Sequence, residues 1–235
     1  MYEYQTRIRY SELDAEGHLT LPALLDYFQD CSTFQSEDLG VGMQYCLDRE
    51  LLWALAGWQI VVKRYPTIGE RVTVGTLPYQ FKGFMGLRNF WMKDEEGNEL
   101  AVANSIWTLI HLKNGTPQKV TPEMYEGYKI EEKIDMDYAP RHITFEGDEI
   151  KEETVEVTKH HLDMNQHVNN GQFVKIAMGF VSDDFKIGQL RAEYKVQAHL
   201  GTIFYPVTYH TDDTIGVDLA DEEGKSYCRL EFKRS

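Results

Sequence analysis

Apolar residues recur at helical spacing in two places along the chain. In the stretches 21–28 and 173–180 they stand at positions i, i+3, i+4 and i+7, which predicts an amphipathic helix at each. Each stretch is followed by segments rich in β-branched and aromatic residues, a composition typical of β-strands. We expect strands at 58–63, 71–78, 86–92 and 100–111 in the first half, and at 189–196, 203–210, 215–219 and 226–233 in the second.

The two halves of the chain also repeat each other in sequence. The segment 13–19, LDAEGHL, matches the segment 162–168, LDMNQHV, at its Leu, Asp and His positions, and a predicted helix follows both. The same four letters, DEEG, form the turn before the last strand of each half, where Gly supplies a positive φ. The repeat predicts an α+β fold of two tandem domains, 1–128 and 129–235, each an antiparallel sheet wrapped around a long helix.

Composition and charge restrict the partners and the compartment. The net charge of -14 disfavours binding to nucleic acid and to anionic membrane surfaces. The longest apolar run, 51–62, is shorter than the roughly 20 residues that a bilayer requires. No secretory signal is visible at the N-terminus, so we expect a cytoplasmic protein. Cys31, Cys46 and Cys228 form no close pair, and we expect them to be reduced and mostly buried.

The second copy of the repeat carries a dense group of polar residues. Asp163, Asn165 and His167 are followed by Asn169 and Asn170, and this run, Asp-x-Asn-x-His-Val-Asn-Asn, resembles the motif of the plant and bacterial acyl-ACP thioesterase family. The resemblance implies a double hotdog fold whose first half forms the acyl-chain pocket and whose second half holds the chemistry. It also implies hydrolysis of the acyl-phosphopantetheine thioester on acyl carrier protein, which releases free fatty acid in fatty acid biosynthesis.

One departure from the family concerns a carboxylate. The segment 193–195, EYK, resembles the Glu-Tyr-Arg of the family's next strand, and plant members have a catalytic Glu three residues after that Tyr, followed by a Cys. This chain has Gln197 and Ala198 at those positions. Gln197 can orient a water by hydrogen bonding but cannot take a proton, so it is a possible supporting residue only. Either Asp163 acts without the second acid, or another acid replaces it.

The residue types of the motif suit thioester hydrolysis. A thiolate leaves readily because its conjugate thiol has a pKa of about 8.5, so no strong general acid is required. Asp163 is a natural general base or, alternatively, a nucleophile, while Asn165 orients the water or substrate and His167 hydrogen-bonds the carbonyl or the Asp. We expect the backbone N–H groups of 168–171 to open the helix unpaired and to form an oxyanion site, with Asn169 and Asn170 shaping that turn.

Alternatives stay open for both copies of the motif and for the activity. An Asp or Asn before a helix is an ordinary N-cap, and we interpret Asp14 and His18 as a structural cap because Glu16 stands where the second copy has Asn165. The same site could act on coenzyme A thioesters. A non-catalytic acyl-binding hotdog module is favoured by the missing carboxylate at Gln197, and a hotdog dehydratase is the least favoured function.

No cofactor or metal is expected, and the protein partner is constrained by charge. The sequence lacks a glycine-rich phosphate loop and a Gly-x-Ser-x-Gly elbow, and His160 and His161 have no nearby Cys to complete a zinc site. Two hotdog domains in one chain are compatible with a monomer, which is then a pseudo-dimer, or with a homodimer. Docking of an acidic carrier protein would need a basic patch, for which the candidates are Lys63, Arg64, Lys159, Arg191 and Lys195.

Overall fold

The computed structural model describes all residues from Met1 to Ser235 and divides them into two compact units. Unit 1 comprises Met1–Ala56 and Val62–Tyr138, and unit 2 comprises Gly57–Val61 and Ala139–Ser235. The domain boundary expected after residue 128 falls within unit 1 and stays a prediction. None of the helices is both long and apolar enough to cross a membrane.

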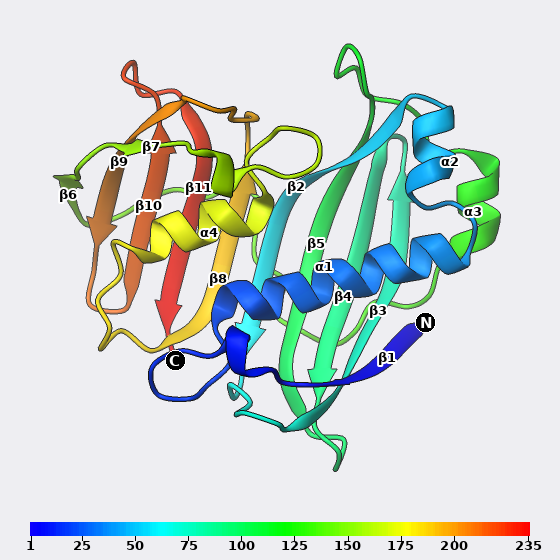
Figure 1. The fold of residues 1–235 in the computed structure, drawn as a ribbon, viewed down its shortest axis with the longest axis horizontal. Helices are drawn as coiled ribbons and strands as arrows, with labels where there is room; N and C mark the ends of the chain where they lie inside the picture. The colour runs from blue at the N-terminus through cyan, green and yellow to red at the C-terminus, as the bar shows by residue number, and fades with distance from the viewer. The chain divides into compact units, whose positions relative to one another are not determined.

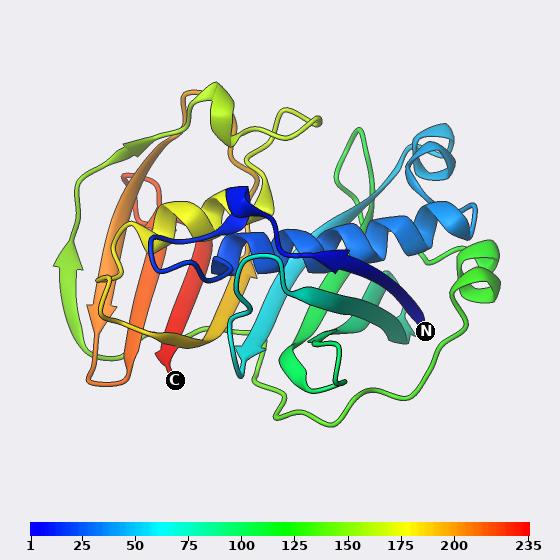
Figure 2. The ribbon, with the colours of Figure 1, turned by 60° about the horizontal axis from the view of Figure 1, so that its bottom comes forward.

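Unit 1 is an antiparallel sheet with a long helix packed on it. The neighbouring strands run in the order β1-β3-β4-β5, and α1 packs against β3 and β1. Figure 2 shows α1 along one face of these strands, with the chain that follows α3 passing on the opposite side. The elements are β1 (Tyr2–Arg7), α1 (Leu21–Asp38), α2 (Met43–Asp48), β2 (Leu51–Val62), β3 (Arg71–Lys82), β4 (Met85–Lys93), β5 (Glu99–His111) and α3 (Pro122–Tyr128), as labelled in Figure 1.

Helix α1 confirms the first amphipathic stretch and extends beyond it. The apolar residues of 21–28 are buried, and the buried face continues through Cys31, Ser32 and Gln35. The side chain of Thr20 caps the helix by accepting the N–H of Ala23. The helix runs on to Asp38 because the stretch 29–38 contains neither Gly nor Pro.

Unit 2 repeats this arrangement with a shorter helix. The strand order is β8-β11-β10-β9-β6, β7 pairs with β9, and the Gly57–Val61 segment of β2 pairs antiparallel with β8. Helix α4 packs against β10 and β11. The elements are β6 (Asp148–Lys151), β7 (Val155–Glu156), α4 (Asn170–Met178), β8 (Ile187–Tyr194), β9 (Ile203–His210), β10 (Thr214–Ala220) and β11 (Ser226–Arg234).

Helix α4 corrects the second helical prediction. It begins at Asn170, three residues before the predicted stretch, and ends at Met178, so it is not the long helix that was expected. Gly179 follows as the C-cap, and Gly has a low helix propensity. The next residues form turns, in which the N–H of Phe185 donates to the carbonyl of Ser182. The predicted strands of both halves are all present, but β2 begins at Leu51, well before the predicted start at residue 58, while the other ends differ by a few residues.

Candidate active site

The polar motif of unit 2 forms a closed loop rather than part of a helix. The N–H of Asp163 donates to the carbonyl of His167 at 2.8 Å, which closes the loop 162–168. The Oδ1 atom of Asp163 accepts the backbone N–H groups of Asn165 at 2.8 Å and His167 at 3.2 Å. All three side chains are partly buried. The loop therefore holds the three predicted catalytic residues together, with the carboxylate anchored through only one of its oxygens.

The corresponding loop of unit 1 has the same backbone construction. There the Oδ1 atom of Asp14 accepts the N–H groups of Glu16 and His18, both at 2.9 Å. Gly17 has a φ of 83°, and Gln166 has a φ of 62° at the equivalent place in unit 2. The prediction that Asp14 and His18 cap the helix is wrong, because Thr20 is the N-cap of α1 and the Asp14 carboxylate instead holds the turn before it. In unit 2 the same turn carries an amide and an imidazole, at Asn165 and His167.

Helix capping does not explain the polar residues of the motif. The N-cap of α4 is Asn169, whose Oδ1 atom accepts the N–H of Gly171 at 2.8 Å. The helix was expected to open at 168–171, and it begins at Asn170, so His167 and Val168 belong to the preceding loop. Neither Asp163 nor Asn165 caps the helix, and the side chain of Asn165 has no bond that would assign it a structural role.

Most of the backbone N–H groups that were expected to form an oxyanion site, at residues 168–171, already donate hydrogen bonds within the protein. The N–H groups of Val168, Asn169 and Gly171 donate to oxygens of the protein at 2.9, 2.9 and 2.8 Å. The expectation of several unpaired amides is therefore wrong for these three residues, because the carbonyls of Ala198 and His161 and the side chain of the N-cap Asn169 supply the acceptors. The N–H of Asn170 at the first helical position has no acceptor. It is the one donor of this turn that a developing oxyanion could use.

A second loop, 195–202, lies against the motif loop and brings a residue that the sequence did not single out. The carbonyl of Ala198 accepts the N–H of Val168 at 2.9 Å. The ring of His199 then meets the ring of His167 edge to face, with centroids 4.7 Å apart and planes inclined by 67°. The side chain of Gln197, which was expected to support the site, is exposed and forms no hydrogen bond. His199, not Gln197, is the residue of this loop that contacts the motif.

The surroundings of His167 favour its uncharged form. Partial burial lowers the pKa of His167, the neighbouring His199 lowers it further, and Asp163 acts in the opposite direction. The result is a pKa below the ordinary value of 6.5. At neutral pH the imidazole is therefore neutral and can both donate and accept a hydrogen bond.

Tyr194 contacts the first residues of α4. Its hydroxyl donates to the carbonyl of Asn170 at 3.0 Å, and its ring lies 5.9 Å from that of Phe173. Burial raises the pKa of Tyr194 far above its ordinary value, so the hydroxyl remains a donor. The preceding Glu193 bonds instead to His142 and to the N–H of Ile143. Of the EYK segment, only Tyr194 contacts the helix that opens the site.

The candidate basic patch is reduced by ion pairs. Lys63 pairs with Glu99, Arg64 with Glu70, and Arg191 with Glu231. Lys159 and Lys195 are exposed and form no ion pair, and both belong to unit 2. They flank the motif in the chain, since Lys159 precedes its loop and Lys195 opens the loop that carries His199. Among the five candidates, these two lysines are the ones without an ion pair.

Metal and thiol chemistry find no support in the geometry. No group of three or more His, Cys, Asp or Glu side chains is placed so that it could hold a metal ion. The three cysteines are unpaired, with Cys31 and Cys228 buried and Cys46 partly buried, as expected. Burial raises the pKa of the Cys31 thiol to about 12 and that of Cys46 to about 11, so neither is a nucleophile near neutral pH.

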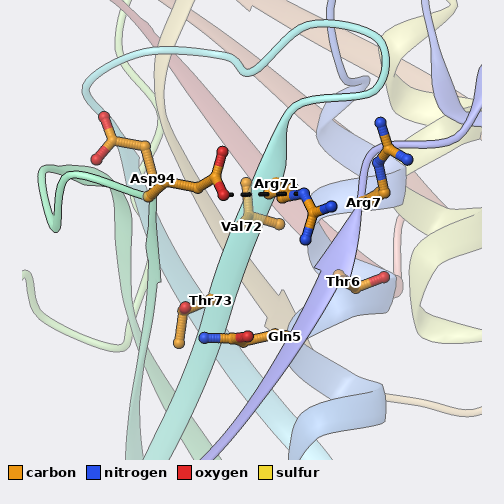
Figure 3. A pocket seen from close by; sticks show the side chains of 8 residues that line it. Gln5, Thr6, Arg7, Arg71, Val72, Thr73 and Asp94 are labelled. Atoms are coloured by element: carbon orange, nitrogen blue, oxygen red, sulfur yellow. Dashed lines mark ion pairs between the residues drawn. The ribbon is translucent and has the colours of Figure 1, made fainter.

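A surface groove of about 290 Å³ lies in unit 1, away from these residues in the chain. It runs between β1 and β3, and Figure 3 shows Arg71 paired with the glutamate beside Asp94 across its end. It contains none of the predicted site residues and mixes both signs of charge. Its lining is Gln5, Thr6, Arg7, Arg71, Val72, Thr73, Asp94 and Glu95.

Residues 1–128 match the family model described as the acyl-ACP thioesterase N-terminal domain. A chloroplastic acyl-acyl-carrier-protein hydrolase from Cuphea viscosissima is 24% identical over 246 residues, which cover 93% of this chain and 55% of the relative. A second Cuphea hydrolase is 26% identical and is covered over 44% of its length. This chain thus spans about half the length of these relatives.

Solved structures match over nearly the whole chain. An acyl-ACP thioesterase from Bacteroides thetaiotaomicron has a TM-score of 0.90 at 18% identity and covers 99% of this chain and 97% of its own. A 12:0-ACP thioesterase from Umbellularia californica has a TM-score of 0.82 at 18% identity, covering 100% and 96%. At such identities the likeness shows the fold alone. The predicted α+β fold of two tandem hotdog domains is confirmed.

Proposed function

This chain belongs to the acyl-ACP thioesterase family, and from that membership we propose that it hydrolyses the thioester of fatty acyl-acyl carrier protein. The observation that carries the proposal is the arrangement of Asp163. Both of its hydrogen bonds use Oδ1, so Oδ2 is left to act on a water molecule. An uncharged His167 lies on the same loop.

The proposed reaction uses Asp163 as the general base. Its carboxylate accepts a proton from water while the water oxygen attacks the thioester carbonyl carbon. The side chains of Asn165 and His167 hold the water and the carbonyl, and the N–H of Asn170 donates to the developing oxyanion. The carbon–sulfur bond then breaks, the sulfur leaves as a thiolate that takes up a proton, and the fatty acid is released.

The alternatives to this proposal are a non-catalytic acyl-binding role and the hydrolysis of acyl-CoA. A non-catalytic acyl-binding role is favoured by Gln197, which replaces the acid of plant members. Against it stands Asn165, whose side chain forms no hydrogen bond that would explain its place on the loop, where unit 1 has Glu16. Hydrolysis of acyl-CoA would use the same groups.

We propose a cytoplasmic location as well, which the unpaired cysteines support.

The proposal is tested with a panel of acyl-ACPs and matching acyl-CoAs whose chains range from short to long. We expect a higher kcat/KM for acyl-ACP than for the acyl-CoA of the same chain, measured by release of free thiol. Faster turnover of acyl-CoA would move the assignment to that substrate. Tight acyl binding without any thiol release would instead support the non-catalytic module.

Docking of the carrier protein provides a separate prediction. Replacement of both Lys159 and Lys195 by Glu is expected to raise KM for acyl-ACP about three- to tenfold, because two attractive charges become repulsive. KM for acyl-CoA should change less, and added salt should reduce the difference between the proteins. Lys186→Glu is the matched control, since Lys186 is also exposed but precedes β8 at the end opposite to Lys195. Equal effects of the double variant and the control would contradict this docking surface.

A further inference from the structure

The loop that carries His199 is held in place by its backbone. The N–H groups of Lys195 and Val196 both donate to the carbonyl of Tyr227 on β11, at 2.9 and 3.2 Å. At the other end the N–H of His199 donates to the Oγ1 atom of Thr202 at 3.1 Å. With the bond from Val168 to Ala198, these contacts fix the loop on both sides of His199. These bonds fix the main chain at His199, and the imidazole itself rests on the ring of His167.

The His199 ring has one aromatic contact, with the ring of His167. The side chain of His199 is exposed, and its nitrogens form no hydrogen bond or ion pair within the protein. An exposed imidazole held edge to face on a second imidazole limits the orientations open to that second ring. In the first unit the N–H of Leu19 donates to the carbonyl of Pro66, as that of Val168 donates to Ala198, and the residue after Pro66 is Thr67, which has no ring. The paired imidazoles are particular to the unit that carries the motif.

We propose that His199 is a positioning residue of the thioester site, which fixes the ring of His167 and, when protonated, opposes a second positive charge there. The inference rests on the proposed function and adds a residue to it. His199 lies two positions after Gln197 on the same loop, and it favours a neutral His167.

The sign of the pH effect follows from the groups that act on His167. Asp163, on its own loop, raises the pKa of His167, while burial and His199, from the neighbouring loop, lower it. Removal of the His199 imidazole takes away one of the two lowering causes. The pKa of His167 then moves up toward 6.5, and more of the ring is charged in mildly acidic solution.

The test compares two replacements of His199 by two measurements. His199→Phe keeps a ring against His167 but removes the charge, and His199→Ala removes both. The first measurement is an NMR titration of the imidazole C2–H signals, in which the spectrum of His167→Gln identifies His167. The second is the pH dependence of kcat/KM for thioester hydrolysis. His160→Phe is the matched control, because it removes an exposed imidazole from the short turn before the motif.

We expect the His199→Phe variant to raise the titration midpoint of His167 by about half a pH unit and to move the acidic limb of kcat/KM by the same amount. Its kcat on the alkaline plateau should stay within about twofold of wild type, whereas His199→Ala should lose about five- to tenfold there. The control should match wild type in both measurements. Identical curves for wild type and both His199 variants would overturn the proposal.

Failure of this inference and failure of the proposed function give different results. If wild type hydrolyses thioesters and the His199 variants are unchanged in both measurements, the function stands and the positioning role does not. If wild type hydrolyses none of the panel, the function is wrong, and the positioning role in that reaction is overturned with it. The NMR titration then still measures the interaction of the two rings.

Discussion

Replacement of Asp163 by Asn is expected to lower kcat for thioester hydrolysis by about 10²- to 10⁴-fold without unfolding the protein. The amide oxygen of Asn can accept the same N–H groups of Asn165 and His167, so the loop stays closed. What is lost is the oxygen that takes the proton from water. Thiol release measured at several pH values gives kcat, and thermal unfolding followed by circular dichroism checks the fold.

Asp14→Asn is the matched control for this variant. Asp14 makes the same two backbone bonds in the loop of unit 1, so the substitution perturbs an equivalent turn without touching the proposed site. We expect its kcat to equal that of wild type. An Asp163→Asn protein that retains most of its activity would show that another group is the base, and His167 would be the next residue to test.

Replacement of Asn170 by Pro is expected to lower kcat by about 10²- to 10³-fold, because it deletes the N–H assigned to the oxyanion. Asn170 is the first residue of α4, where proline fits without loss of a helical hydrogen bond. The preceding Asn169 already has the extended backbone that proline favours, with φ -61° and ψ 143°. The free energy of unfolding should therefore change by less than about 1 kcal/mol.

Asn170→Ala separates the backbone donor from the side chain. It keeps the N–H and the carbonyl that accepts from Tyr194, and removes only the amide side chain. If the backbone N–H is the donor, Ala should leave kcat nearly unchanged while Pro lowers it. Equal losses in both variants would assign the effect to the side chain of Asn170, and an active Pro variant would place the oxyanion elsewhere.

Much of the fold was predictable because the sequence repeats itself. Helical spacing located the two main helices, composition located the eight longest strands, and the Leu, Asp and His positions of the repeat related the two halves. The short elements β1, α2, α3, β6 and β7 were not predicted, since segments of two to seven residues carry too little periodicity. The end of α4 was missed because Gly179 outweighed an apolar spacing that continued to Phe180.

The site was only partly predictable because it depends on which loops meet. Asp163, Asn165 and His167 were found since they are close in sequence and one loop holds them. The amides of 168–171 were expected to be free because acceptors supplied by other segments, such as the carbonyl of Ala198, leave no mark in the sequence. His199 was missed for the same reason: its partner is 32 positions away in numbering, and no spacing rule connects two loops.

The shared loop has a consequence for how such sites diversify. In both units one aspartate oxygen and the bonds of the main chain define the turn, while the side chain of Asn165 forms no hydrogen bond in it and that of Glu16 only approaches Nδ1 of His18, at 3.9 Å. A duplicated domain can then lose or acquire chemistry at these positions while its backbone remains a constant template. Gene duplication followed by substitution on an unchanged turn would produce one chemically equipped copy beside one purely architectural copy, which is the division of labour between these two loops.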